Sequence, residues 1–304
     1  MPRLRTTPQH TSLTKLYTRT RLRIMGSIPP PPSKPVKVLM LHGYTQSGPL
    51  FRAKTRALEK NLQKAFPAGI TLHYPTAPIR LAPADVPFAV SNNTEGGDKE
   101  ETEAWAWWRR KGDGTPYVYE GLEKGLAHIA EVLKTEGPFD GVIGFSQGGC
   151  AAGMLASLLD PGRREAFQAA QQNGGIPYPE AFEKDTEEGK AQIHPPLKFA
   201  VSYSGFAPVD TPFYQAFYEP KIKTPVLHFL GTLDTVVEEA RSLALVKACE
   251  NSEGRVVYHP GGHFLPSSQK APVSALIAFM KEVLHNVEPR NEKEDSVEGM
   301  DVPF

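Results

Sequence analysis

The sequence predicts an α/β fold in which a mostly parallel central sheet is flanked by helices on both faces. Short apolar runs, typical of buried strands, alternate along the chain with segments in which apolar residues recur at helical spacing. Strands and helices that alternate in this way favour a parallel sheet with helices packed on it. The chain has 304 residues, 40% of them hydrophobic, which suffices for one sizeable core.

The N-terminal half begins with a continuous apolar run at residues 36–41, which predicts a buried strand. A helix is expected next, with an apolar face made of Phe51, Leu58, Leu62 and Phe66. Residues 70–74 predict another strand, which stops at Pro75. Residues 76–116 show no clear period and hold the three tryptophans, so we expect a long loop that is functional or disordered.

The central part of the chain predicts a helix whose apolar stripe runs from Val118 to Leu133 and which ends at Gly137-Pro138. Residues 139–145 predict a strand that leads directly into Ser146, and the small residues after it suit a helix packed closely on a sheet. Residues 160–196 are polar and interrupted by prolines. We interpret them as an insertion at the rim of the domain.

The C-terminal half carries three more strand signals, at residues 199–203, 226–230 and 256–258. Helical patterns lie between and after them. The last helix is expected to present one apolar stripe, made of Val273, Leu276, Ile277, Met280 and Leu284.

One α/β domain is therefore expected at residues 35–287. Residues 1–34 form a basic leader with a proline-rich linker, and residues 288–304 an acidic, flexible tail. The first 25 residues hold no acidic side chain, a composition that fits a mitochondrial transit peptide, a disordered leader or residues upstream of a start at Met25. With only two cysteines, Cys150 and Cys249, a reducing compartment is the default and we expect a cytoplasmic protein.

Composition also argues against several classes of function. The formal net charge is zero and the pI is about 7.1, so no nucleic-acid-binding surface is indicated. No apolar run is long enough for a transmembrane helix. The chain has no Cys-x-x-Cys pair, and its glycine-rich segment at 144–149 lacks the spacing of a phosphate-binding loop. We therefore expect neither a metal site nor a cofactor.

Gly144-Phe145-Ser146-Gln147-Gly148 matches the pattern Gly-x-Ser-x-Gly. In an α/β-hydrolase fold this pattern forms a sharp strand-to-helix turn that lifts the serine oxygen above the sheet, with glycines where side chains would clash. A serine hydroxyl needs a base to become a nucleophile. Because the pattern follows a predicted strand and precedes a small-residue helix, we interpret Ser146 as a catalytic nucleophile rather than as a surface serine in a turn.

His42-Gly43-Tyr44 ends the first predicted strand. In this fold the loop at that position and the residue after the nucleophile each supply a backbone donor to the oxyanion hole. The backbone N–H groups of Tyr44 and Gln147 are therefore the candidate donors. Such a donor contributes about 3 kcal/mol to stabilising the transition state.

The acid and the base of a triad should follow the serine in the order acid, then histidine. Asp234 lies just past the strand at 226–230, where sites gather in open α/β sheets, and is preferred to Asp210 or to a role as a helix cap. His263 follows two glycines after the strand at 256–258. It is preferred to His259, which lies nearer the strand and precedes Pro260.

Over residues 36–285 the sequence resembles the eukaryotic FSH family of small serine hydrolases, which includes fungal thioesterases of polyketide pathways. The shared motifs lie at residues 38–48, 107–108, 144–149, 204–206, 231–237 and 260–266. The resemblance implies an α/β-hydrolase fold and hydrolysis of an ester or thioester by a triad of Ser146, Asp234 and His263. The segment 160–196 is longer than a minimal member needs, and we expect it to reshape the acyl pocket.

The substrate is expected to be a small-molecule acyl ester or thioester. Candidate residues for its pocket are His42, Trp107, Trp108 and Phe206, since aromatic side chains offer large apolar areas, although packing under the long loop explains the tryptophans equally well. Two alternatives stay open: an acyltransferase of the same fold, and a non-catalytic binding protein. The intact set of serine, aspartate and histidine favours an enzyme. The sequence does not indicate an oligomeric state.

Overall fold

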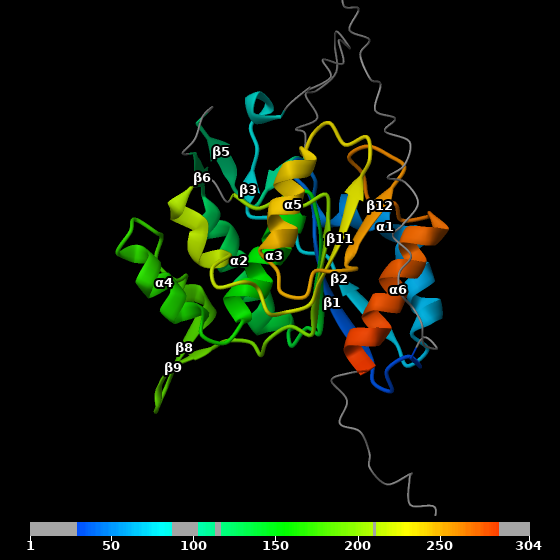
Figure 1. Cartoon of the computed structure of the whole chain (residues 1–304), viewed down its shortest axis with the longest axis horizontal. Helices are drawn as coiled ribbons and strands as arrows, with labels where there is room; N and C mark the ends of the chain where they lie inside the picture. The colour runs from blue at the N-terminus through cyan, green and yellow to red at the C-terminus, as the bar shows by residue number, and fades with distance from the viewer. Residues whose placement is uncertain (1–28, 87–102, 113–116, 209–210, 286–304) are drawn as a thin grey trace, which may run out of the picture.

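Six parallel strands form the central sheet, in the order β12-β11-β10-β7-β1-β2 (Figure 1). The computed structural model describes residues 29–86, 103–112, 117–208 and 211–285, so the predictions for the basic leader and the acidic tail lie outside the described residues. The strands are β1 (Val36–Leu41), β2 (Ile70–His73), β7 (Gly141–Phe145), β10 (Phe199–Tyr203), β11 (Val226–Gly231) and β12 (Val256–His259).

Burial follows the position of each strand in the sheet. Every residue of β7 and β10 is buried, whereas the edge strand β2 has no fully buried residue. Strands covered on both faces read as continuous apolar runs, which is why the sequence located the central strands. The carboxyl ends of β1, β7 and β10 stand side by side, since Gly144 pairs with both Leu41 and Ser202.

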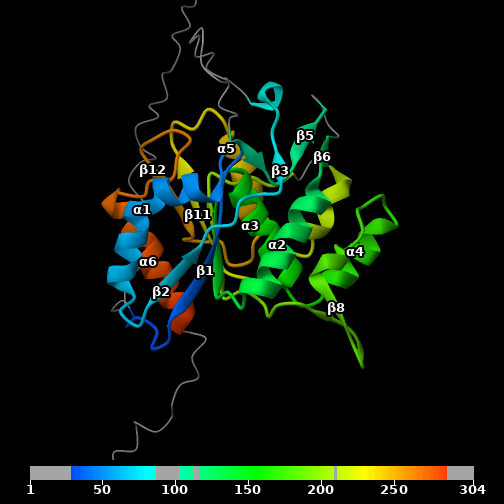
Figure 2. The same cartoon turned by 180° about the vertical axis from the view of Figure 1, so that it is seen from behind.

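Helices cover both faces of the sheet, which confirms the predicted fold class (Figures 1 and 2). The helices α1 (Gly48–Ala65) and α6 (Lys270–His285) pack on one face, where their apolar side chains meet Val38 and Met40. On the other face α2 (Leu122–Glu136), α3 (Gln147–Leu159) and α5 (Glu239–Lys247) pack around Leu39 and Leu41. None of the helices in the described ranges is both long and apolar enough to span a bilayer.

The helix predicted to start near Val118 starts later, at Leu122. Val118 belongs instead to β6 (Val118–Glu120), which pairs with β5 (Arg109–Lys111). Gly121 separates the strand from the helix with a φ of +81°, a conformation that favours glycine, and a Cβ there would lie 2.5 Å from Ile79. Val118 is 48% exposed, and the residue of β6 that enters the core is Tyr119, so Val118 matched the helical spacing without sharing the buried face.

The long segment expected at residues 76–116 contains short regular elements as well as loop. Strand β3 (Ile79–Arg80) pairs with β4 (Trp105–Ala106), and a 3₁₀ turn, η2, spans Pro83–Asp85. Residues 87–102 and 113–116 lie outside the described ranges. Strands of two or three residues are too short to produce a recognisable period in the sequence.

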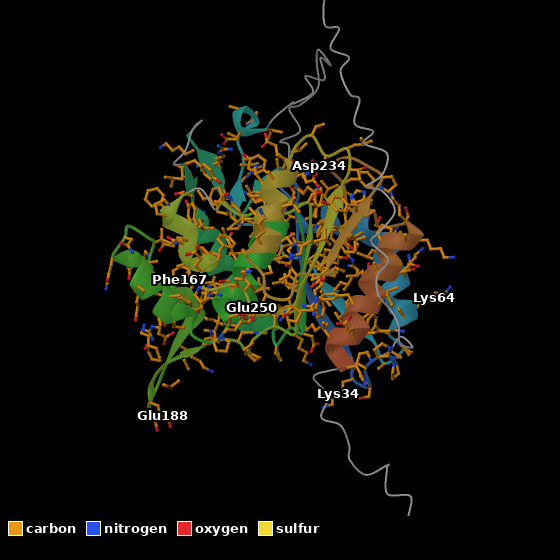
Figure 3. All side chains as sticks on the ribbon, viewed as in Figure 1. Lys34, Lys64, Phe167, Glu188, Asp234 and Glu250 are labelled. Atoms are coloured by element: carbon orange, nitrogen blue, oxygen red, sulfur yellow. The ribbon has the colours of Figure 1, made fainter. Side chains whose placement is uncertain are left out.

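The insertion predicted at residues 160–196 contains α4 (Arg163–Gln171), the 3₁₀ turn η3 (Glu180–Phe182) and a hairpin of β8 (Glu183–Thr186) and β9 (Gly189–Gln192). Helix α4 packs against η4 (Pro212–Phe217) through edge contact of Phe167 with Phe217. The hairpin tip at Glu188 and the side chain of Asp234 lie at opposite ends of the molecule (Figure 3). The hairpin therefore does not reshape the region around Asp234.

Candidate active site

Ser146 occupies a strained turn between β7 and α3. Its backbone has φ 54° and ψ −116°, outside the regions that ordinary L-residues populate. The flanking glycines make this turn possible. A Cβ at Gly144 would lie 1.9 Å from the carbonyl oxygen of Gly148, and one at Gly148 would lie 2.0 Å from that of Leu41. This is the strand-to-helix turn that the Gly-x-Ser-x-Gly pattern predicted.

The structure brings Ser146, Asp234 and His263 together although they are far apart in the sequence. The Nε2 atom of His263 lies 2.9 Å from the Oγ atom of Ser146, and its Nδ1 atom lies 2.8 Å from an oxygen of Asp234. Each of the three follows the carboxyl end of a parallel strand. These ends lie along one edge of the sheet, so residues that are far apart in the sequence can meet there. The contacts fit an imidazole that donates from Nδ1 to the carboxylate and accepts at Nε2 from the hydroxyl.

Asp234 uses its two carboxylate oxygens for different tasks. Oδ1 accepts hydrogen bonds from the backbone N–H groups of Val236 and Val237, both at 3.0 Å, and Oδ2 accepts from His263. Burial raises the pKa of the Asp234 carboxyl, but the Val237 N–H and His263 lower it more, so the net pKa lies below its usual value. Asp234 is not a helix cap, because α5 begins only at Glu239 with Glu238 at its N-cap, and the bonds from Val236 and Val237 close a turn instead.

Ser204, just past β10, also lies beside this carboxylate. Its hydroxyl is close enough to help lower the pKa of Asp234, although its buried oxygen makes no hydrogen bond of normal geometry. Ser204 has a φ of +46°, which for a residue other than glycine is a strained conformation. Ser204 belongs to the motif shared at residues 204–206, but nothing in the local sequence indicates which carboxylate it faces.

Of the rival acid and base, only His259 lies in the described ranges, and it makes no hydrogen bond to Ser146 there. Asp210 lies outside the described ranges. His259 is 1% exposed, and neither of its ring nitrogens has a hydrogen-bond partner among the described residues. Burial lowers the pKa of His259, and the smaller effect of the Asp234 charge, which raises this pKa, does not cancel it.

His259 and His263 stand four residues apart, a His-x-x-x-His spacing that is common in metal sites. They lie in a strand and a loop, and His263 turns toward Ser146 and Asp234. Across the described parts of the chain, no three His, Cys, Asp or Glu side chains gather in a way that could hold a metal ion.

The two candidate oxyanion donors are far apart in the sequence but follow two strands that are neighbours in the sheet. Gln147 is the first residue of α3, whose first N–H groups have no partner within the helix, and Tyr44 follows β1, the strand next to β7. In the described part of the chain, neither backbone N–H donates a hydrogen bond to another protein group. Both groups are therefore available to a ligand, and their role as donors stays a prediction.

The four residues predicted to line the pocket are mostly packed inside the protein. His42 and Trp107 are 0% exposed, and Trp108 is 2% exposed and stacks on Tyr119. Phe206 is 9% exposed and lies under the guanidinium of Arg241, 4.3 Å from the ring centre. In this structure His42 and Trp107 offer no surface to a substrate, because their side chains are enclosed by protein atoms.

Two types of comparison connect this geometry to known proteins. A family model described as "Serine hydrolase (FSH1)" matches residues 32–274. "Family of serine hydrolases 2" of Saccharomyces cerevisiae is 33% identical over 234 residues, which cover 76% of this chain and 92% of that protein. A Schizosaccharomyces pombe protein named "Dihydrofolate reductase" is 35% identical over 244 residues. The match covers 77% of this chain but only 44% of that protein, so this chain corresponds to less than half of it.

Solved structures agree on the architecture. Acyl-protein thioesterase 2 of Zea mays superposes with a TM-score of 0.50 and 19% sequence identity, covering 84% of this chain and 96% of that one. At this identity the likeness shows the α/β-hydrolase fold alone. The match of the family model and the similarity to the yeast protein over nearly its whole length go further, and they confirm the resemblance stated from the motifs. The chain therefore belongs to the serine hydrolase (FSH1) family and is a serine hydrolase enzyme.

Proposed function

We propose that this enzyme cleaves carboxylic ester or thioester bonds through an acyl-enzyme formed on Ser146. The observation that carries the proposal is the unbroken hydrogen-bond chain from the Asp234 carboxylate through His263 to the Ser146 hydroxyl. A serine oriented in this way, at the carboxyl edge of a parallel sheet, has what nucleophilic attack on an acyl carbon requires.

In the first half of the reaction, the Ser146 oxygen attacks the carbonyl carbon while Nε2 of His263 takes the hydroxyl proton. The backbone N–H groups of Tyr44 and Gln147 hold the negative oxygen of the tetrahedral intermediate. The bond to the leaving group then breaks, and His263 returns the proton to the departing alkoxide or thiolate. The products are a free alcohol or thiol and an ester on Ser146.

In the second half, a water molecule attacks the acyl-enzyme while His263 takes one of its protons. The bond to Ser146 breaks, the serine oxygen recovers a proton from His263, and the carboxylic acid leaves. Asp234 keeps the ring in the required orientation throughout and stabilises its charged form. The lowered pKa of the Asp234 carboxyl keeps that group ionised at neutral pH, as this role demands.

A fluorophosphonate probe and a p-nitrophenyl acyl ester test the nucleophile. Wild type should be labelled and hydrolyse the ester, whereas Ser146→Ala should do neither. Ser157→Ala is the matched control, because Ser157 is also a buried serine but lies in the last turns of α3, away from Asp234 and His263. Labelling that persists in Ser146→Ala would remove the basis of the proposal.

A panel of acyl esters and acyl-pantetheine thioesters of graded chain length then identifies the substrate class. The same acyl group presented as ester and as thioester separates the preference for the leaving group from that for the acyl chain. Ser146→Ala should be inactive on every member of the panel. Turnover by that variant would mean that a second group in the protein carries out hydrolysis.

A further inference from the structure

The side chain of Gln147, the residue after Ser146, binds the backbone of two tryptophans. Its Oε1 atom accepts a hydrogen bond from the N–H of Trp107 at 2.9 Å, and its Nε2 atom donates to the carbonyl of Trp108 at 2.8 Å. Gln147 is 5% exposed, so the two bonds are shielded from water. The amide therefore fixes the segment at Trp107 to the first residue of α3.

Trp107 also binds the other side of the site through its side chain. The indole Nε1–H donates to the carbonyl of His42 at 2.9 Å, and the two rings lie 5.2 Å apart between their centres. The backbone of Trp107 is supported from behind by α2, since a Cβ at Gly125 would lie 2.1 Å from the Trp107 carbonyl oxygen. One fully buried residue thus joins the segment after β1 to the start of α3.

His42 carries the connection to the candidate oxyanion donor at Tyr44. Its Nε2 atom accepts from the N–H of Ala77 at 2.9 Å, which leaves the proton on Nδ1, where it can donate to the carbonyl of Gly43 at 2.8 Å. Burial lowers the pKa of His42 to about 4, so the ring is neutral at neutral pH and this tautomer holds. The Gly43 carbonyl belongs to the peptide unit that contains the N–H of Tyr44.

From these contacts we infer that Gln147, Trp107 and His42 form a brace that sets the spacing of the two oxyanion donors before substrate binds. The inference rests on the proposed function and gives the three side chains positioning roles. The donors at Tyr44 and Gln147 come from different segments of the chain. Stabilising the transition state requires both to point at one oxygen, and a structure already arranged in this way needs no reorganisation during the reaction.

Trp107→Phe and Gln147→Met test the brace. The first keeps an aromatic ring but removes the indole N–H, and the second keeps most of the side-chain volume and the backbone N–H but removes both amide bonds. Each should lower kcat for a p-nitrophenyl ester by about 10- to 100-fold, less than the loss of a whole oxyanion donor, with KM changed by less than about threefold. A defect in substrate binding alone would raise KM instead.

The double variant gives the sharper result. If the two side chains act through one brace, the double variant should be hardly slower than the slower single variant, because the first change already breaks the connection. Fully additive losses in kcat would refute the brace, as would wild-type kcat in both single variants. Gln192→Met is the matched control, since this half-buried glutamine also donates to a carbonyl, that of Leu158 at 3.1 Å, away from the site.

The same experiment separates failure of the brace from failure of the proposed function. Wild type and Gln192→Met must be labelled by the fluorophosphonate probe and must hydrolyse the ester. If they are not, the proposed function is wrong. Thermal unfolding reports whether each variant folds. Gln147→Met leaves the packing of the indole intact, so it decides the question if Trp107→Phe does not fold.

Discussion

The buried histidine of β11 gives the folded protein a measurable sensitivity to acid. His228 is 2% exposed, and its Nε2 atom has no hydrogen-bond partner within the described residues. Burial lowers the pKa of His228 to about 3, and the charge of Arg255 acts in the same direction. The folded protein therefore keeps this ring neutral at a pH where the unfolded chain has already taken up a proton.

The sign and the size of the effect follow from these two pKa values. In the unfolded chain the ring binds its proton near the ordinary pKa of 6.5, and in the folded protein only near 3. Between these values the unfolded state holds more protons, so the free energy of unfolding falls as the pH falls. On acidification from about pH 7 to about pH 5, His228 alone should account for a loss of about 2 kcal/mol.

Urea unfolding of wild type and His228→Leu at the two pH values measures this loss. The other titrating groups are common to both proteins, so the difference between their pH dependences isolates His228. The variant should lose about 2 kcal/mol less than wild type on acidification. Equal losses in the two proteins would refute the argument. His285→Gln, which changes an exposed histidine at the end of α6, should behave like wild type.

Three further changes test the site and its supports. Asp234→Asn should lower kcat for a p-nitrophenyl ester by about 10⁴-fold, because the amide no longer holds His263 in the required tautomer, and activity near the wild-type level would exclude that role. Gly148→Ala places a Cβ 2.0 Å from the carbonyl oxygen of Leu41, so both activity and melting temperature should fall, and an unchanged melting curve would contradict the clash. Arg163→Leu leaves the buried Asp160 carboxylate, 3.6 Å from the guanidinium, without its cation. In urea unfolding, the free energy of unfolding should fall by about 3–5 kcal/mol, and a fall of less than about 1 kcal/mol would mean that this ion pair does not stabilise the fold.

The site could be located from the sequence because of a property of parallel sheets. All six strands point the same way, so residues that follow their carboxyl ends meet at one edge whatever their separation along the chain. Ser146, Asp234 and His263 each follow an apolar run that reads as a strand, after β7, β11 and β12. Finding three strand ends with the required residue types was therefore enough to predict that the three side chains would meet.

Local sequence patterns gave the wrong structure where contacts between distant residues decide it. The stripe beginning at Val118 had helical spacing, yet the positive φ of Gly121 and its close approach to Ile79 end a short strand before the helix begins. The polar segment at residues 160–196 holds a helix anchored by Arg163, whose guanidinium donates to the carbonyls of Ala216 and Pro220. No sequence pattern shows that carbonyls more than fifty residues away will face one arginine.

Local patterns in the sequence were enough to predict the six strands of the central sheet, its mostly parallel arrangement and the three residues of the candidate triad, because periodicity and strand ends are local features. The local patterns could not show that His42 and Trp107 are enclosed in protein, or that the side chain of Gln147 binds the backbone of residues 107 and 108. Such hydrogen bonds join segments about forty residues apart. Their existence depends on how the sheet and its helices pack, and that packing is set by the whole chain at once.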